Sequence, residues 1–491
     1  MSLAAADRPS PANAALAPLV VDLDGTLTPT DTLLESVLQL LKREPARLLV
    51  VPVWLAKGRA GLKESVASRA PFSADHLPLR EDFVKFLRDE RARGRRIVLA
   101  TAAHRDIASA IAARLGLFDA VLATHGGVNL KGATKLKAIR ESLGDDFVYA
   151  GDSSADLPIW KGARAAILVG VKPALAREVR RTTSVEREFP AERAGLRTWL
   201  RSMRVHQWLK NLLLFVPLLT AFSFLDTAKL LTAVGAFIAF GLAASATYIG
   251  NDLWDLDSDR RHPRKRSRPF ASARIPIVRG IAAASVLLAA ALLLAAVLSW
   301  GFLIMLLIYL VTTTAYSWTL KEYVLIDVLT LSILYTLRIL AGAVVVGVTT
   351  SSWLLAFSVF IFFSLALLKR CSELVALGQT GHHATAGRDY RVTDLVVLWP
   401  LGVGAALCAV VVFGFFISAP ETQTRYLTPQ LLWLVAAGLI YWLSRLWIKT
   451  ARGEMDDDPI VFAMRDFGSR VVVAAMIVVT IIAHFVHLGA P

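Results

Sequence analysis

The chain has 491 residues, of which 55% are hydrophobic and 19% charged, and its formal net charge is +15. Its length exceeds one ordinary domain, and its mean hydropathy of +0.54, with apolar residues concentrated after about residue 205, excludes a purely water-soluble protein. The cations crowd into loops between apolar segments, so anionic lipids and phosphate substrates explain them better than nucleic acid. The two cysteines exclude a disulfide framework.

Three short apolar runs in the first third of the chain each end in polar residues. They are Pro18–Asp22, Arg96–Thr101 and Phe147–Asp152, and helix-like segments separate them. This pattern predicts a parallel α/β sheet, in which polar residues at the carboxyl ends of strands form the ligand site.

The polar residues that follow these runs carry a recognisable order. Asp22 and Asp24 lie in D-L-D-G-T, and Thr101, Lys135 and the pair Asp152/Asp156 come later in the chain. This order resembles the haloacid dehalogenase superfamily of phosphohydrolases, whose fold is Rossmann-like. The alternative is a degenerate domain kept for structure.

The resemblance implies a role for each of these residues. Asp22 is the nucleophile, and Asp24 protonates the leaving oxygen and then activates water. Thr101 and Lys135 hold the phosphoryl oxygens, with Lys131 and Lys137 as competitors for the lysine role. Magnesium is held by Asp22, Asp152 and the backbone carbonyl of Asp24, and Asp156 supports the site. A carboxylate attacks phosphorus only if such cations quench the repulsion between them.

Composition gives the expected domain boundaries. Residues 1–17 are predicted to be a disordered N-terminus without a signal peptide, and residues 18–185 the phosphatase domain, with a helical cap at about 33–90. Residues 186–206 are predicted to be a linker that includes an amphipathic helix, lying either on a membrane surface or on the soluble domain. Residues 207–491 form the membrane domain.

The segment Asn251–Ala273 combines acids with a dense run of cations. Asp252, Asp255 and Asp259 are three and four residues apart, so on a continuous helix they share one face. Hard divalent cations such as Mg²⁺ prefer these oxygen ligands. Cations and two prolines follow at once, which favours a site for a diphosphate or phosphate ester over a solvated loop.

The pattern N-D-x-x-D-x-x-x-D followed by H-P-R-K-R-S-R-P resembles the first aspartate-rich motif of the UbiA superfamily of intramembrane prenyltransferases. It is most similar to the decaprenyl-phosphate phosphoribosyltransferase branch. The resemblance implies that Asp252 and Asp255 are catalytic, that Asp252, Asp255 and Asp259 hold a second magnesium ion, and that Asn251, Lys265, Arg266 and Arg268 bind substrate.

Nine apolar segments are long enough to be considered as membrane spans. They are 207–224, 228–249, 276–298, 302–317, 323–346, 352–374, 395–418, 430–448 and 469–488, which predicts an all-α membrane bundle. The loops after the second, fourth, sixth and eighth segments carry most of the cations, so these loops and the soluble domain are expected in the cytoplasm and the C-terminus outside.

Polar residues in apolar segments are costly, so each is a candidate for function. The candidates for substrate binding are Lys210, Asn211, Tyr316, Lys321, Asp327, Arg338 and Lys369. Asp327 and Arg338 are eleven residues apart and could instead form a mutual ion pair that fixes packing. Aromatic prenyltransferases of the superfamily carry a second acid pair here, but Leu331 takes the position of its second acid.

Three functions remain open from the sequence. The first is Mg²⁺-dependent transfer of 5-phosphoribosyl from phosphoribosyl diphosphate to a polyprenyl phosphate, with the soluble domain hydrolysing a phosphate monoester such as the 5-phosphate of the product. The second is transfer of a prenyl group from a prenyl diphosphate to an aromatic acceptor. The third is a non-enzymatic membrane partner or transporter. The sequence leaves a homo-oligomer open.

Overall fold

The structure is a computed structural model, and it describes residues 16–44, 46, 50, 53–54, 58–67, 69, 74–125, 129–191, 194–379, 388–455 and 459–487. The chain forms two compact units, which we treat separately. The first comprises residues 1–203 and 248–284, and the second residues 204–247 and 285–491. The predicted disordered tail lies outside the described residues except for Leu16 and Ala17.

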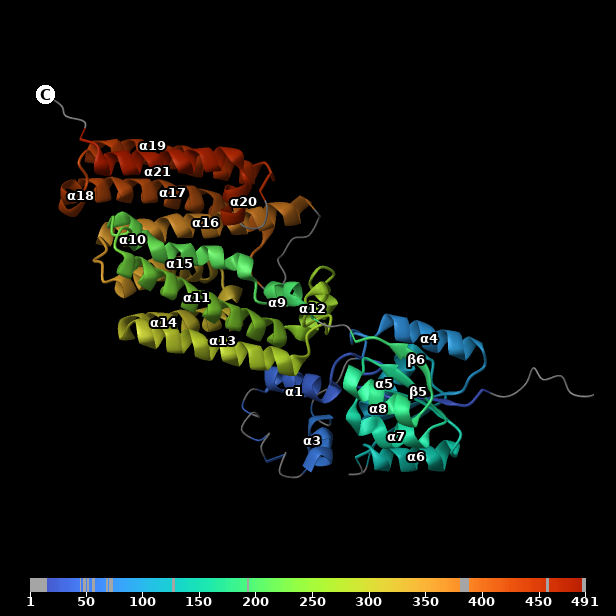
Figure 1. The fold of residues 1–491 in the computed structure, drawn as a ribbon. Coiled ribbons are helices and arrows are strands. Elements are labelled where there is room, and N and C mark those ends of the chain that lie inside the picture. The colour runs from blue at the N-terminus through green and yellow to red at the C-terminus, as the bar shows by residue number, and fades with distance from the viewer. Residues whose placement is uncertain are drawn as a thin grey trace, which may run out of the picture. The chain divides into compact units, whose positions relative to one another are not determined.

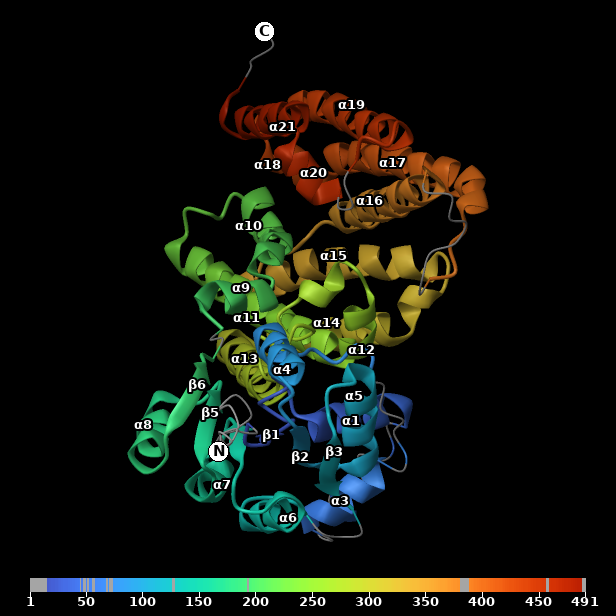
Figure 2. The same ribbon diagram turned by 90° about the vertical axis from the view of Figure 1, so that its right-hand side faces the viewer.

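A six-stranded sheet of order β3-β2-β1-β4-β5-β6 forms the centre of the first unit, and all of its neighbouring strands are parallel (Figure 2). The strands are β1 (Leu19–Val21), β2 (Ile97–His104), β3 (Ala120–Thr124), β4 (Val148–Gly151), β5 (Ala165–Val169) and β6 (Val185–Phe189). The predicted Rossmann-like α/β sheet is confirmed. Because β6 ends at Phe189, the sheet extends into the residues predicted to begin the linker.

Helices cover both faces of this sheet, as the side-chain alternation of a strand requires. Leu19 and Val21 of β1 belong to a cluster with residues of α4 (Glu81–Ala92) and α5 (Arg105–Leu115). Val20 belongs to the opposite cluster, with residues of α6 (Ala133–Leu143), α7 (Leu157–Gly162) and α8 (Pro173–Thr182). The sheet is therefore a buried central layer with its carboxyl edge free for ligands.

The helical insertion after β1 contains α1 (Thr32–Arg43) and α3 (Gly58–Ala67). These helices have a small apolar cluster of their own, which includes Leu40, Trp54, Leu62 and Val66. Helix α4 instead buries Phe83, Phe86 and Leu87 against the sheet. The separate cap layer therefore lies within residues 32–67, a narrower segment than the predicted 33–90.

The acid-rich segment also belongs to the first unit. Helix α11 (Thr227–Trp254) ends just before Asp255, α12 (Leu256–Arg261) follows, and a 3₁₀ turn spans Lys265–Ser267. Helix α13 (Ile277–Leu298) begins after Pro276. The segment is thus two helices with a break at Asp255 rather than one continuous helix.

Long apolar helices dominate the rest of the chain (Figure 1). Within the described residues, eight helical segments are long and apolar enough to cross a membrane. They are Thr227–Trp254, Ile277–Leu298, Trp300–Trp318, Ile326–Val346, Ser352–Gln379, Val392–Ser418, Pro429–Ala451 and Phe467–Phe485, the helical parts of which are labelled α11, α13, α14, α15, α16, α17, α19 and α21. The predicted all-α membrane bundle is confirmed.

The first of the nine predicted spans has a different form. Residues Val205–Phe215 make a 3₁₀ helix, η4, and Val216–Thr220 make the short α-helix α10. Because a 3₁₀ helix rises about 2.0 Å per residue and an α-helix about 1.5 Å, these sixteen residues extend about 30 Å. That length matches the hydrocarbon core of a bilayer, although the segment is too short to do so as an α-helix.

Candidate functional sites

The predicted phosphatase residues lie together at the carboxyl edge of the sheet. Asp22 follows β1, Thr101 lies within β2, and Asp152 follows β4. Strands β2 and β4 flank β1 on either side, so three neighbouring strand ends supply these side chains. Asp22 and Thr101 are buried, and all three line one pocket together with Asp24.

Lys135 is the lysine that contacts the nucleophile candidate. Its Nζ lies 2.9 Å from Asp22 Oδ1 and donates to the Tyr149 hydroxyl at 3.0 Å. Burial alone would lower the pKa of Lys135, but the adjacent carboxylates Asp22 and Asp156 outweigh it and raise that pKa. The side chain of Lys137 is 79% exposed and pairs with Glu141, so it is no competitor for this position.

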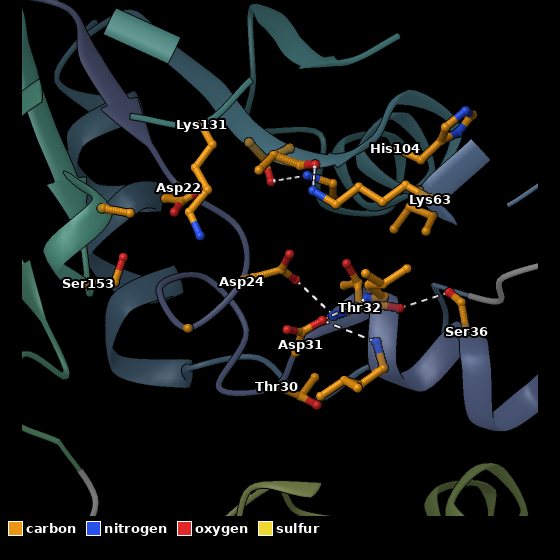
Figure 3. A pocket seen from close by; sticks show the side chains of 18 of the residues that line it. Asp22, Asp24, Thr30, Asp31, Thr32, Ser36, Lys63, His104, Lys131 and Ser153 are labelled. Atoms are coloured by element: carbon orange, nitrogen blue, oxygen red, sulfur yellow. Dashed lines mark hydrogen bonds between the residues drawn. The ribbon is translucent and has the colours of Figure 1, made fainter. Parts of the chain in front are cut away.

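Lys131 also lines the pocket, and Figure 3 shows its side chain extending toward Asp22 and Asp24. The structure therefore brings two of the three sequence candidates to the site. Lys135 contacts the carboxylate of Asp22, while Lys131 lines the same pocket.

The loop that carries the two leading aspartates is packed against the end of β4. Gly25 has φ +80°, and a Cβ there would lie 2.2 Å from Asp152 Oδ2, so only glycine fits this approach. Asp156 is buried and accepts hydrogen bonds from the Tyr149 hydroxyl at 2.8 Å and from the Ser153 backbone at 3.1 Å. Asp156 thereby fixes the loop that presents Asp152.

Asp22, Asp152 and Asp156 each offer a carboxylate oxygen within 4.8 Å of the others. Burial, followed by repulsion from Asp22 and Asp156, raises the pKa of Asp152 to about 8. Burial, followed by repulsion from Asp31, raises the pKa of Asp24 to about 7. A divalent cation would relieve this repulsion, and oxygen-only donors suit magnesium, so the residues fit the predicted ion.

The pocket has a volume of about 580 Å³ and is lined by more than the predicted residues. Lys63 of the cap helix α3 enters it and donates to Ala102 O at 2.6 Å and to Asn129 Oδ1 at 3.1 Å. Its lining also includes the apolar residues Leu62, Val66 and Ile277. Sequence reasoning missed Lys63, and the only available signal was its place in the insertion between the first two strands.

The second predicted metal site differs from expectation. The three aspartates have different surroundings: Asp255 is half-buried and lies 3.7 Å from Lys42, whereas Asp252 and Asp259 are buried. Arg268 Nη1 joins that buried pair, at 3.2 Å from Asp252 Oδ1 and 2.7 Å from Asp259 Oδ2. In this arrangement one guanidinium bridges the two carboxylates and offsets one of their two negative charges.

The cations predicted to bind substrate in this segment are otherwise exposed. Lys265 and Arg266 occupy the 3₁₀ turn, where neither is buried. Asn251 is half-buried in the last turn of α11, and its carbonyl accepts from the Asp255 backbone at 2.8 Å. The segment thus presents exposed cations beside two buried acids that share one arginine.

The second unit gathers another set of predicted residues. Asp327, fully buried, forms an ion pair with Arg370 and accepts from the Tyr316 hydroxyl at 2.8 Å. Arg370 also pairs with Glu373. The possible mutual pair of Asp327 and Arg338 is therefore wrong, because Arg370 of a neighbouring helix binds Asp327 instead.

Arg338 lies in a different network with the start of the membrane domain. Its Nε donates to Asn211 Oδ1 at 3.0 Å, and its Nη2 donates to the Tyr309 hydroxyl at 3.0 Å. Lys210 lies 6.0 Å from the centre of the Tyr335 ring. The half-buried Lys321 and Lys369 lie in the turn after α14 and in α16.

An apolar cavity of about 630 Å³ lies within the second unit. Its wall is supplied by η4, α10, α15, α16, α19, α20 (Pro459–Arg465) and α21, with Leu213, Phe362 and Ile477 among the lining residues. Lys210 and Arg470 are its only charged lining residues among those the structure describes. A long apolar group with an anionic head fits such a lining.

The fold and the two sets of polar residues define a multi-pass membrane protein with a phosphohydrolase-like domain. The model of the UbiA prenyltransferase family matches residues 212–469, and that of haloacid dehalogenase-like hydrolases matches residues 19–161. The chain belongs to the UbiA prenyltransferase family and carries a haloacid dehalogenase-like domain before it.

Two relatives and one solved structure illustrate the similarity. "Uncharacterized protein y4nM" of Sinorhizobium fredii is 39% identical over 461 residues, covering 91% of this chain and 87% of the relative. "Decaprenyl-phosphate phosphoribosyltransferase" of Mycobacterium tuberculosis is 31% identical over 221 residues, covering 44% and 73%. A UbiA homolog from Archaeoglobus fulgidus bound to GPP and Mg²⁺ aligns with a TM-score of 0.44 at 17% identity, covering 59% of this chain and 100% of that one.

Proposed function

We propose that the chain is a bifunctional enzyme that transfers 5-phosphoribosyl from phosphoribosyl diphosphate to a polyprenyl phosphate and then removes the 5-phosphate from the lipid product. In the transfer, a phosphate oxygen of the lipid bonds to the ribose C1 as the bond from C1 to the diphosphate breaks. In the hydrolysis, water replaces the ribose oxygen on phosphorus and inorganic phosphate leaves.

The combination of transfer and hydrolysis in one chain is supported mainly by the residues that line the hydrolase pocket. Its lining combines the polar groups Asp22, Asp24 and Lys135 with apolar residues that include Ile277 and Val278. These two residues begin α13, a candidate membrane span. A phosphate ester whose apolar portion stays at a membrane fits this mixed lining.

The hydrolytic steps follow from the positions of the side chains. Asp22 attacks phosphorus, and Asp24 gives a proton to the departing ribose oxygen; a pKa of about 7 leaves Asp24 protonated in a useful fraction of molecules. Asp24 then takes a proton from the water that releases phosphate from Asp22. Lys135 and Thr101 hold phosphoryl oxygens. Magnesium on Asp22, Asp152 and the Asp24 carbonyl would supply charge neutralisation.

Two features support phosphoribosyl diphosphate as the donor for the transfer. The mycobacterial relatives that share about a third of their residues over the matched part are named for this transfer. Leu331 also replaces the second acid that aromatic prenyltransferases carry at this position. Lys265, Arg266 and Arg268 would bind the diphosphate, and the prenyl chain would occupy the apolar cavity headed by Lys210.

The remaining predicted residues have roles that fit their surroundings. Tyr316 and Asp327 lie in one network and would orient the ribose hydroxyls, with Lys321 and Lys369 binding the 5-phosphate. Asn211 and Arg338 hold η4 against α15 and would position Lys210. Because Arg268 occupies the space between Asp252 and Asp259, we assign no step to a magnesium ion there.

Purified full-length protein with labelled phosphoribosyl diphosphate, polyprenyl phosphate and magnesium tests the proposal. We expect a labelled lipid without its 5-phosphate from the wild type, and the same lipid with its 5-phosphate from Asp22→Asn. Asp252→Ala should abolish lipid labelling because Asp252 holds Arg268, which we assign to the diphosphate, and Asp255→Ala should do so because the motif resemblance implies a catalytic acid at that position. Unchanged labelling in these two variants would exclude the assigned transferase site. Loss of labelling in Asp22→Asn would show that Asp22 is also needed for transfer, so the assignment of one activity to each domain would be wrong.

The family match itself favours a second candidate, transfer of a prenyl group to an aromatic acceptor. The same preparation supplied with a prenyl diphosphate and an aromatic acid decides between them. A prenylated aromatic product, with no lipid labelling from phosphoribosyl diphosphate, would establish this second function.

A further inference from the structure

Helix α1 of the cap is joined to helix α12 of the acid-rich segment by a buried ion pair. Both elements belong to the first compact unit. Arg260 Nη1 and Nη2 lie 2.6 Å and 2.7 Å from the two carboxylate oxygens of Glu35, so the pair is bidentate. The side chains of Glu35 and Arg260 are 2% and 5% exposed. Arg260 Nε also donates to Ala271 O at 3.1 Å, which ties the pair to the chain ahead of α13.

Two weaker contacts continue along the same face of α1. Gln39 Nε2 donates to Asp257 Oδ1 at 3.0 Å, and Lys42 Nζ donates to Trp254 O at 3.3 Å. Residues 35, 39 and 42 are spaced by about one helical turn, so three successive turns of α1 face the segment around α12. The buried pair is the one contact of the three that solvent does not screen.

Each end of the buried pair is close to residues of a proposed active site. The backbone N–H of Thr32, one turn before Glu35, donates to Asp24 Oδ1 at 2.9 Å. On the other side, Asp259 directly precedes Arg260 and forms the ion pair with Arg268, which also binds Asp252. A shift of α1 against α12 would therefore move hydrogen-bonding partners at both places.

We propose that Glu35 and Arg260 form a positioning pair that links the two active sites. The pair holds the start of α1 against Asp24, and it holds α12 so that Asp259 and Arg268 keep their places. Neither residue touches substrate in this role. The inference rests on the two activities proposed above. It adds that the hydrolase site depends on Arg260 of the acid-rich segment and that the transferase site depends on Glu35 of the cap.

The test measures each activity after a change on the opposite side. In full-length protein, Arg260→Gln should lower kcat for hydrolysis of p-nitrophenyl phosphate about tenfold, and Glu35→Gln should lower phosphoribosyl transfer by a similar factor, since small misplacement of catalytic groups has effects of this size. Arg261→Gln and Arg43→Gln are matched controls. Each removes an exposed charge from the same helix as one member of the pair and should leave both rates unchanged.

The double variant Glu35→Gln/Arg260→Gln separates positioning from stability. A single substitution leaves a buried charge without its partner, whereas the double variant leaves none. We expect the double variant to regain the melting temperature of the wild type but not its two rates. Recovery of both rates together with the melting temperature would reduce the pair to a structural role and overturn the proposal.

Amide hydrogen exchange in residues 32–43 gives a readout that needs neither activity. In Arg260→Gln, but not in Arg261→Gln, these amides should exchange faster than in the wild type. A wild type inactive in both assays would defeat the proposed function, and the exchange experiment would still decide whether the pair holds α1. Unchanged exchange in Arg260→Gln, or unaltered rates on the opposite side in an active enzyme, would overturn the positioning pair.

Discussion

At the scale of single residues, the phosphatase site depends on charges that balance only when every partner is present. Lys135 is buried beside Tyr149 and Asp156, and its Nζ lies 2.9 Å from Asp22, the proposed nucleophile. Without Lys135, the buried carboxylates of Asp22 and Asp156 would repel each other, and they would also repel an incoming phosphate. The same helix offers an exposed lysine, Lys137, two residues away.

Lys135→Met should therefore lower kcat for phosphate release by about a hundredfold or more, because a preorganised charge at a phosphoryl group has effects of this size. Lys137→Met should leave the rate within about a factor of two, as expected for an exposed residue with one surface ion pair. Steady-state phosphate release by the full-length protein measures both. Equal losses in the two variants would contradict the assignment.

The pKa of Asp152 predicts how magnesium binding depends on pH. Without metal, burial and the carboxylates Asp22 and Asp156 raise this pKa to about 8, so the proton competes with the ion below that pH. The apparent affinity for magnesium should rise about tenfold per pH unit up to about pH 8 and then level off, since one proton is released on binding.

Calorimetric titration of the full-length protein with magnesium, at several pH values and in buffers of different ionisation enthalpy, measures both the affinity and the released proton. Asp152→Asn should remove this proton release together with the pH-dependent part of the affinity. A pH-independent affinity in the wild type would contradict the prediction.

At the scale of elements, the strands were easier to predict than the contacts between polar residues. The runs that end in Asp22, Thr101 and Asp152 are continuous and apolar because β1, β2 and β4 are buried on both faces. Edge strand β6, with sequence V-E-R-E-F, has charged and mostly exposed residues, so it lacks that signal. The same physical reason explains why its residues were assigned to a linker.

The acid-rich segment shows what spacing alone cannot determine. Helical spacing does not tell which partner each acid meets: Asp255 lies near Lys42, whereas Asp252 and Asp259 contact Arg268. Which cation binds which acid also depends on distant elements: Arg370 rather than Arg338 binds Asp327, and Glu35 binds Arg260. Similarly, η4 packs closely on α15, where Asn211 accepts from Arg338.

This packing predicts the effect of a single methyl group. A Cβ at Gly342 of α15 would lie 2.1 Å from the carbonyl oxygen of Leu214 in η4, so the two backbones would have to separate. Gly342→Ala should cost about 1–3 kcal/mol of stability, the usual range for overpacking, and should weaken the nearby Arg338–Asn211 hydrogen bond.

Gly404→Ala in α17 is the matched control, because a Cβ there meets no atom within 4 Å. Alanine should be neutral or stabilising by up to about 1 kcal/mol at that position, owing to its higher helix propensity. Thermal unfolding of the detergent-solubilised variants compares the two. A Gly342→Ala protein as stable as the wild type would show that η4 and α15 have room to move apart.

At the scale of the whole molecule, the two proposed activities can cooperate only if the chain has the right orientation in the membrane. The eight long apolar helices and the family establish a multi-pass membrane protein. The distribution of cations in its loops then favours one orientation. A product made by the membrane domain can reach the hydrolase pocket only if both work on the same side.

We predict that the hydrolase domain and the cation-rich loops lie in the cytoplasm, and that the C-terminus lies outside. This requires an odd number of crossings, so the segment formed by η4 and α10 must cross in addition to the eight long helices. Its length of about 30 Å permits this, given the rise of 3₁₀ and α-helices.

Single cysteines in a Cys371→Ser/Cys408→Ser background, labelled in intact cells with a membrane-impermeant maleimide, measure the side of the membrane on which each position lies. Residues 225 and 487 should label from outside, whereas residues 145 and 264 should label only after lysis. Labelling of residue 145 in intact cells would reverse the orientation, and protection of both 225 and 264 would show that α10 turns back without crossing.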